Sequence, residues 1–213
     1  MTHAYNNPVA LVYDDHVLFA ESFAAVLERL AFFSSVQTFE QEHPLRRFLL
    51  KHGNEPVYVF LDYYLPQKNA LSLIKDIRRM NKKARIIVTS SVSDPILIRH
   101  ILTYEPNGFI NKTSGVENVV ACLNTIEQHE TYICPIVQHI LDIHGNSGPV
   151  ITFTAREMEI LQYFARGLSI VETAEATNLS KHTIVSHRRN MMSKSGAKSI
   201  VELLAYAYTN HLI

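Results

Sequence analysis

The chain has 213 residues, 47% of them hydrophobic, and its 20 basic and 20 acidic side chains leave no net charge. This composition excludes disorder as the main state and is typical of one large or two small folded domains. Balanced charge predicts neither a nucleic-acid binder nor a membrane-surface protein. Cys122 and Cys134 are too few for a disulfide framework and favour a reducing compartment. No apolar run nears the roughly 18 residues of a membrane span, and Asp14 and Asp15 come too early for a signal peptide, so we expect a soluble cytoplasmic protein with no membrane partner.

Residues 9–127 alternate short β-rich runs with longer helical patterns, which predicts βαβ units around a parallel sheet. The expected strands are 9–13, 36–39, 57–61, 85–89 and 108–111. Between them, apolar residues three and four positions apart predict covering helices. Asp94 before Pro95 is typical of a helix start, and Ser114 with Glu117 matches a capping box. We therefore expect an α/β doubly wound sheet of five parallel strands with five helices.

The pattern changes after about residue 128, and Gly145–Gly148 is the clearest group of helix and strand breakers. This predicts a first domain at 1–128, a linker at 129–150 and a second domain at 151–213. Three pairs in the second domain match the capping box: Thr154 with Glu157, Ser169 with Glu172, and Ser199 with Glu202. A further helix is expected after Ser180, ending at Gly196 in the left-handed position. The second domain is therefore predicted to be small, all-α and built of four helices.

Chemically active residues follow four of the expected strands. In an open parallel sheet, ligands bind outside the carboxyl ends of the strands. There the first strand delivers Asp14 and Asp15, the third Asp62, the fourth Ser90 and the fifth Lys112. Three carboxylates repel one another unless a hard cation neutralises them, and Mg²⁺ prefers oxygen ligands and substrate phosphate. The sequence predicts a Mg²⁺ and phosphate site, in which Asp62 is the nucleophile and Asp14 and Asp15 hold the metal.

Each of these residues also has an ordinary structural interpretation. A single Asp after a strand is more often a helix cap or a turn former than a ligand. Alone, Lys112 would be a solvated surface lysine, and Ser90 would be the start of a loop. The occurrence of all five at equivalent strand ends favours the site.

The order of these motifs resembles the receiver domain of two-component response regulators over residues 8 to about 128. The residues that carry the resemblance are Asp14-Asp15-His16, Leu61-Asp62-Tyr63-Tyr64-Leu65-Pro66, Ser90, and Gly108-Phe109-Ile110-Asn111-Lys112. The second half is similar to the LuxR-type helix-turn-helix through residues 153–157, 167–169, 180–190 and 194–196. Together the halves resemble a NarL/LuxR-class response regulator, with a flavodoxin-like receiver before the helix-turn-helix domain.

The resemblance implies a transcription factor whose only catalysis is its own phosphotransfer and autodephosphorylation. The implied partners are a sensor histidine kinase, double-stranded promoter DNA and, indirectly, RNA polymerase. It also implies a homodimer in the phosphorylated or DNA-bound state, for which the last helix would supply the contact. The implied site residues are Asp62 as phosphoacceptor, Asp14, Asp15 and Asp62 as Mg²⁺ ligands, and Ser90, Phe109 and Lys112 as the residues that sense the phosphoryl group.

Some positions depart from the family pattern. Ala70 stands where glycine is usual, so that turn cannot rely on a positive φ. Asn178 replaces another usual glycine, between two helices, and Asn tolerates the left-handed conformation better than most residues. Ser195 replaces a usual core leucine, which predicts a weak point in packing. Thr89 and Ser91 flank Ser90, which is preferred because its spacing to Lys112 matches the family.

Basic charge in the second half is concentrated on one expected helix and its exit. Residues 150–213 hold seven Lys or Arg against five Glu, whereas 180–198 hold five basic side chains and no acid. Such a field suits DNA phosphates, and a helix-turn-helix places its second helix, here 181–195, in the major groove. Ile184 and Met191 should face the core. The predicted DNA contacts are Lys181, Thr183, Val185, Ser186, Arg188, Arg189 and Lys194. Arg189 is the best base reader, because a guanidinium can bond guanine bidentately.

Other functions compete with a phosphorylation-controlled transcription factor. An aspartyl-phosphate phosphatase also uses an Asp after a parallel strand, but it needs a carboxylate two residues later, where Tyr64 stands. A flavoprotein would need a phosphate-binding loop of Gly, Ser and Thr after the first strand. The main alternative is a receiver-type transcription factor that a ligand or protein partner switches without phosphorylation, an interpretation that Ala70 and Tyr64 keep open.

Overall fold

The structure, a computed structural model, describes residues 7–65, 70–143, 153–210 and 212–213. The described chain divides into two compact units. One comprises the described residues of Met1–Val92 with Tyr104–Asp142, and the other comprises Ser93–Thr103 with those of Ile143–Ile213. The breaker cluster Gly145–Gly148 and the motif residue Pro66 lie outside the described residues.

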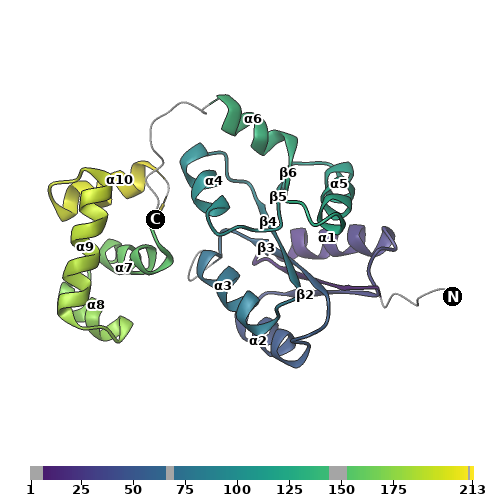
Figure 1. The fold of residues 1–213 in the computed structure, drawn as a ribbon, viewed down its shortest axis with the longest axis horizontal. Helices are drawn as coiled ribbons and strands as arrows, with labels where there is room; N and C mark the ends of the chain where they lie inside the picture. Colours follow the sequence, from purple (N-terminus) through teal and green to yellow (C-terminus); the bar gives the residue numbers. More distant parts are fainter. Residues whose placement is uncertain (1–6, 66–69, 144–152, 211) are drawn as a thin grey trace. The chain divides into compact units, whose positions relative to one another are not determined.

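A parallel sheet of six strands forms the centre of the first unit (Figure 1). The strands are β1 (Val9–Tyr13), β2 (Ser35–Phe39), β3 (Val57–Asp62), β4 (Ala84–Ser90), β5 (Gly108–Asn111) and β6 (Tyr132–Ile133). Their order across the sheet is β2-β1-β3-β4-β5-β6. The five predicted strands are confirmed to within a residue or two at each end, but the predicted total of five is wrong.

The sixth strand lies inside the predicted linker. Tyr132 pairs with Gly108 and Ile133 with Phe109, and helix α6 (Pro135–Ile143) follows. The first part of 129–150 is therefore ordered against the edge of the sheet. A strand of two residues is too short to produce an alternating pattern, so no periodicity predicts it. Pro135 at the first helical position was the available signal for α6.

Helices cover both faces of the sheet, as the doubly wound prediction requires. They are α1 (Val17–Arg29), α2 (Glu42–Lys51), α3 (Leu71–Met80) and α5 (Val116–Glu127), while α4 (Pro95–Leu102) lies in the chain between β4 and β5. Figure 1 shows α1 and α5 on one face and α2 and α3 on the other. Leu27 of α1 and Ile126 of α5 belong to one buried cluster around Tyr58 and Phe60 of β3. The crossover helices thus hold the strand ends in place from both sides.

Two helix starts test the capping predictions in this part of the chain. The Asp94 carboxylate accepts a hydrogen bond from the Leu97 amide at 2.8 Å, which confirms the predicted cap of α4. The capping box predicted for Ser114 and Glu117 is wrong, because α5 begins one residue later with Gly115 as its N-cap. The Ser114 amide instead donates to the Asn111 carbonyl in the preceding turn.

Ala70 does not strain the turn in which glycine is usual. Its φ of −63° and ψ of −16° lie in the right-handed helical region, which alanine adopts freely. Its amide donates to the Tyr63 carbonyl at 3.1 Å. The substitution is therefore compatible with the backbone at this position.

Ala31, directly after α1 and its C-cap residue, does carry backbone strain. Its φ is 53°, in the left-handed region that costs a residue with a Cβ roughly 1–2 kcal/mol. Glycine avoids this cost, but its greater conformational freedom in the unfolded chain offsets part of the gain in stability. We expect Ala31→Gly to raise the free energy of unfolding by about 0.5–1 kcal/mol in urea denaturation. Ala20→Gly, inside α1, is the matched control and should lower it by about 1 kcal/mol; destabilisation by both changes would contradict the interpretation.

The second unit contains the four helices predicted for residues 151–213. They are α7 (Ala155–Ala165), α8 (Ile170–Thr177), α9 (Lys181–Ser195) and α10 (Ile200–Thr209). Full capping boxes begin α7 at Thr154 and α8 at Ser169, as predicted. At α10 the box is incomplete, since Ser199 caps the Glu202 amide but the Glu202 carboxylate accepts from the Lys198 amide.

The turns around α9 have the predicted left-handed residues. Asn178 has φ 52°, and Gly196, which ends α9, has φ 70°. Ser195 satisfies its hydroxyl by donating to the Met191 carbonyl at 2.9 Å. Ser195 therefore leaves no unsatisfied hydroxyl at the position where leucine is usual. In the part of the chain that the structure describes, no helix combines the length and hydrophobicity that crossing a membrane requires.

Candidate functional site

The two strands that flank the reversal of strand order bring the key carboxylates together. β1 lies between β2 and β3, so the crevice at their carboxyl ends is the expected ligand position of such a sheet. Tyr13 pairs with Leu61 in the register, which places the next residues, Asp14 and Asp62, side by side. Both residues are buried, with exposed fractions of 0% for Asp14 and 1% for Asp62. The sequence-based prediction of an acidic cluster here matches this arrangement.

Lys112 reaches this cluster from the end of β5. Its Nζ lies 2.7 Å from Asp14 Oδ2 and 3.1 Å from Asp62 Oδ2. The same ammonium lies 4.6 Å from the centre of the Phe19 ring, close enough for a cation–π contact. Phe19, on the first turn of α1, carried no signal in the sequence because its role depends on where α1 packs. The buried Asp14 and Asp62 and the partly buried Lys112 thus form one charge network.

The negative charge of the network exceeds what Lys112 neutralises. Besides the ion pairs with Lys112 and His16, four buried carboxylate oxygens have no hydrogen-bond partner among the described residues: Asp14 Oδ2, Asp15 Oδ1 and both oxygens of Asp62. Burial first, and then the Asp14 and Asp15 charges, raise the pKa of the Asp62 carboxyl to about 6 against the opposing effect of Lys112. A further positive charge close to Asp62 would therefore stabilise its ionised form.

His16 adds a nitrogen donor that the predicted site did not include. Its Nδ1 lies 3.1 Å from Asp15 Oδ1 and 3.3 Å from Asp14 Oδ1, and the side chain is 67% exposed. Asp14, Asp15, His16 and Asp62 each offer a ligand atom, and all four atoms lie within 4.8 Å of one another. Buried carboxylate oxygens at this spacing, whose described partners are only the ion pairs with Lys112 and His16, fit a hard divalent cation. The position of His16 directly after Asp14-Asp15 was the signal for its role.

The predicted switch residues lie on the two strands beside this cluster. Ser90 is fully buried, its Oγ accepts from the Val92 amide at 3.2 Å, and its carbonyl accepts from the Lys112 amide at 3.0 Å. Ser90 is therefore joined to Lys112 through the backbone. Phe109 is also fully buried, in β5 between Val88 and Ile133. Thr89, the competing hydroxyl, pairs in register with Asp62.

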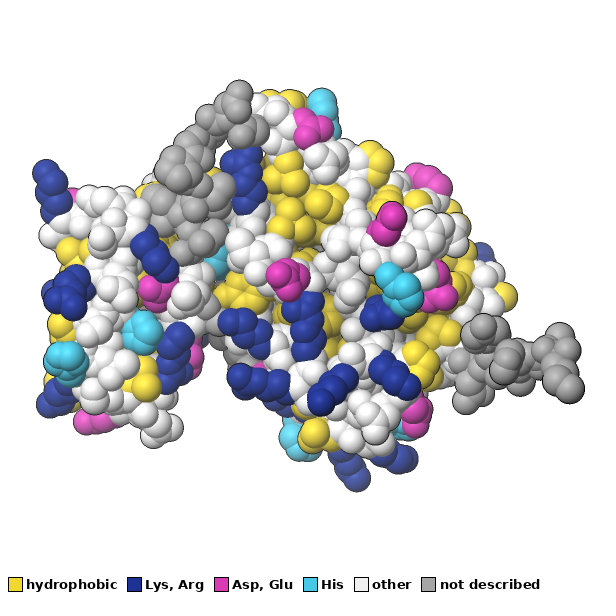
Figure 2. Space-filling model, in the orientation of Figure 1, with side chains coloured by type: hydrophobic (Ala, Val, Ile, Leu, Met, Phe, Trp, Pro, Cys, Tyr) yellow, Lys and Arg dark blue, Asp and Glu magenta, His cyan; other side chains and the backbone are white. Residues whose placement is uncertain are grey.

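The second unit presents a basic helix with an apolar inner face. Ile184 and Met191 of α9 are fully buried, as predicted for its core positions. Of the predicted DNA contacts, Lys181, Val185, Arg189 and Lys194 are exposed, and Thr183, Ser186 and Arg188 are partly exposed. In Figure 2, Lys and Arg side chains spread over this unit, at the left of the view. The α8-turn-α9 arrangement is that of a helix-turn-helix with an accessible second helix.

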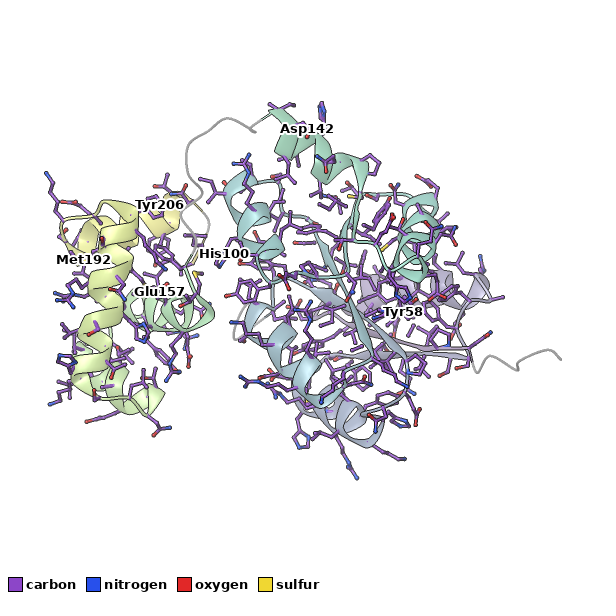
Figure 3. All side chains as sticks on the ribbon, in the orientation of Figure 1. Tyr58, His100, Asp142, Glu157, Met192 and Tyr206 are labelled. Carbon is purple, nitrogen blue, oxygen red and sulfur yellow. The ribbon has the colours of Figure 1, made fainter. Side chains whose placement is uncertain are left out.

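Two of the predicted contacts also have partners inside the unit. Lys194 Nζ lies 2.6 Å from Oε2 of the buried Glu157, which is labelled on α7 in Figure 3. Burial raises the pKa of the Glu157 carboxyl, but hydrogen bonds from Lys194 and Thr154 outweigh it and hold the pKa below its usual value. The Thr183 hydroxyl lies 2.8 Å from the Ser180 hydroxyl at the helix start. Lys194 therefore ties α9 to α7, a role that the sequence did not reveal.

The two halves match two known families in chain order. The family described as "Response regulator receiver domain" matches residues 10–124, and "Bacterial regulatory proteins, luxR family" matches residues 152–207. The chain belongs to the NarL/LuxR class of response regulators. Among the relatives of this response regulator, the Fimbriae Z protein of Salmonella typhimurium is 30% identical over 158 residues, which cover 73% of this chain and 75% of the relative. The oxygen regulatory protein NreC of Staphylococcus epidermidis is 25% identical over 215 residues, 95% of this chain and 98% of NreC.

Solved structures share the fold of the response regulator. RcsB from Salmonella enterica serovar Typhimurium, bound to promoter rprA in the presence of phosphomimetic BeF3−, has a TM-score of 0.68 at 24% identity. The similarity covers 94% of this chain and 98% of that chain. A second structure, an RcsB–DNA complex, has a TM-score of 0.61 at 24% identity. These similarities support the same fold for both halves.

Proposed function

We propose that this DNA-binding response regulator is phosphorylated on Asp62 by a sensor histidine kinase and thereby controls transcription in the cytoplasm. The observation that carries the proposal is the buried Asp62 carboxylate, which lies beside Asp14 and 3.1 Å from the Lys112 ammonium. A buried carboxylate with one oxygen, Oδ1, that has no hydrogen-bond partner among the described residues, and with a cation beside the other, is suited to attack phosphorus. The protein would catalyse only its own phosphotransfer and autodephosphorylation.

In the proposed transfer, an oxygen of Asp62 bonds to the phosphorus of the kinase's phosphohistidine as the phosphorus–nitrogen bond breaks, and the imidazole keeps the electron pair. Asp14, Asp15 and Asp62 would hold Mg²⁺, whose positive charge offsets that of the phosphoryl oxygens. Lys112, now paired with Asp14 and Asp62, can turn its ammonium to the phosphoryl group. The Phe19 ring borders this ammonium, with its centre 4.6 Å away.

The same geometry supports a switch that runs through β4 and β5. A phosphoryl group adds a charge of roughly −1.5 to −2, which would attract the Ser90 hydroxyl and Lys112. The Ser90 hydroxyl holds the Val92 amide, so its movement would pull on the loop after β4. Phe109 is already buried, and its neighbour across the sheet is Ile133 of β6. A change in the packing of Phe109 would therefore displace β6.

The proposed output is binding of a homodimer to double-stranded promoter DNA, with an indirect effect on RNA polymerase. Support comes from the exposed basic face of α9 and from the RcsB structures, one of which contains two RcsB dimers bound to two parallel DNAs. Lys181, Arg188 and, when released from Glu157, Lys194 would contact phosphates. Val185, Ser186 and Arg189 would face base edges.

Base reading by Arg189 can be separated from phosphate binding by Lys181. On a site selected from random DNA with the full chain, Arg189→Ala should cost about 1–3 kcal/mol and relax the preference at one base pair. Lys181→Ala should weaken all sequences alike and lower the salt slope by about one unit. Binding isotherms at several salt concentrations measure both. If both variants lose only nonspecific affinity, α9 does not read bases.

Phosphorylation itself is tested with the full chain, Mg²⁺ and acetyl phosphate. Intact mass should increase by one phosphoryl group, and affinity for the selected DNA and the dimer fraction should rise in the same sample. DNA binding that is strong without any adduct, and unchanged by the donor, would instead favour a regulator switched by a ligand or protein partner.

A further inference from the structure

A pocket of about 500 Å³ opens at the amino-terminal edge of the sheet, the edge opposite the carboxylate cluster. Its walls come from segments that precede or follow strands at that edge, including Phe32 before β2, Lys82 and Lys83 before β4, and Glu127 at the end of α5. The volume lies within the range of roughly 300–1,000 Å³ that small-molecule sites occupy. The pocket is therefore large enough for an organic ligand.

Positive charge dominates the pocket. Lys82, Lys83 and Arg85 line it, whereas Glu127 is the one acidic residue among the described residues that line it. The Glu127 carboxylate accepts a hydrogen bond from the Tyr58 hydroxyl. Neither lysine ammonium forms an ion pair with any residue that the structure describes. An anion could thus be bound without first breaking an ion pair of either lysine.

Aromatic rings form the inner wall. Phe32 packs edge-on against Tyr58, with ring centres 5.5 Å apart at 86°. Tyr58, labelled in Figure 3, is 2% exposed, so its ring is held by the core of the sheet. Its phenol stays protonated at neutral pH, because burial and the Glu127 charge raise its pKa above the usual value. The wall therefore offers the Phe32 ring as an apolar surface next to three cations, and the buried Tyr58 ring holds the Phe32 ring from behind.

Backbone strain occurs at the same rim. Ala31, whose φ of 53° is unfavourable for alanine, lines the pocket directly before Phe32. Strain of this kind persists where surrounding structure enforces it, and it often accompanies binding sites. Ala31 sets the direction in which the chain leaves α1 and so helps place the Phe32 ring.

We propose that this pocket binds a small aromatic anion, a molecule with a planar ring and one carboxylate, sulfonate or phosphate group. The ring would pack on Phe32, and the anionic group would lie among Lys82, Lys83 and Arg85. Edge-on aromatic packing and charge-assisted hydrogen bonds supply the two kinds of contact. Because the pocket lies at the opposite edge from Asp62, its ligand would not occupy the phosphorylation site.

The test uses the full chain and three probes with NMR detection: 1-naphthoate, adenosine monophosphate and the uncharged 1-naphthalenemethanol, with inorganic phosphate as the ring-free anion. At least one ring-bearing anion should shift amide signals of residues 31–32 and 82–85 saturably. It should bind at least about tenfold more tightly than the uncharged ring or phosphate alone. The comparison of naphthoate with the nucleotide distinguishes the two sources of an aromatic anion.

Variants locate the contact. Lys82 and Lys83 are both exposed, and the double variant Lys82→Ala/Lys83→Ala should bind the anion about tenfold or more weakly. Added salt should weaken binding further. Lys51→Ala, an exposed lysine that does not line the pocket, and Asp62→Asn should leave the affinity unchanged. Equal affinity in the double-lysine variant, equal binding of the uncharged ring, or shifts confined to other residues would each overturn the proposal.

Discussion

Asp62→Asn should abolish the phosphoryl adduct that forms with acetyl phosphate and Mg²⁺. The amide has the same shape as the carboxylate but lacks the nucleophilic charge, and Asp62 Oδ2 lies 3.1 Å from the Lys112 ammonium. Asp15→Ala should instead slow the transfer and raise the Mg²⁺ concentration needed, because Asp15 is 30% exposed at the rim of the cluster. Intact-mass spectrometry over time measures both effects.

The matched control is Asp76→Asn on α3. This carboxylate is also part of an ion pair, with Arg46, and also 30% exposed, but it does not belong to the acidic cluster. The control should form the adduct at the rate of the unchanged chain. If the adduct persists undiminished in Asp62→Asn, another residue is the nucleophile, and the proposed function loses its basis.

The acidic cluster was predictable because it depends on strand ends rather than on detailed packing. Once β1, β3 and β5 are placed in a parallel sheet, Asp14, Asp62 and Lys112 must meet at one edge. Phe19 and His16 are different, since their contacts with the cluster depend on the direction in which α1 leaves β1. No periodic pattern records that direction, so Phe19 was found only in the three-dimensional structure, whereas His16 was marked in the sequence only by its position directly after Asp14-Asp15.

The same distinction applies to the fold. Long elements with clear periodicity were found, whereas β6 depends on pairing with β5 across more than twenty residues of sequence. The capping box at Thr154 was predicted correctly, but its Glu157 carboxylate also binds Lys194 of α9. A local motif therefore located the helix start without revealing the long-range ion pair that changes the interpretation of Lys194.

Relative to the Asp62→Asn variant, the metal-free protein should lose stability as the pH rises from about 4 to about 7, because the Asp62 carboxyl gives up its proton in this range. The Asp62 pKa is raised from 3.8 to about 6 by burial and by Asp14 and Asp15. The folded protein then binds the proton more tightly than the unfolded chain does. This contribution to stability is present below pH 4 and is lost as the pH passes through 6. At about 1.4 kcal/mol per pKa unit, the loss is roughly 2–3 kcal/mol.

Urea unfolding of the full chain in EDTA, followed through NMR signals of the first unit, measures this difference at pH 4 and pH 8. The free energy of unfolding of the Asp62→Asn variant should exceed that of the unchanged chain by about 2–3 kcal/mol at pH 8. At pH 4 the difference should be much smaller. Excess Mg²⁺ should narrow the gap at pH 8, because a cation that binds only the folded carboxylates stabilises the unchanged chain. Asp76→Asn should leave the pH dependence as it is. If the difference in unfolding free energy is the same at both pH values, ionisation of Asp62 does not destabilise the folded protein. The cluster would then need no cation to be stable.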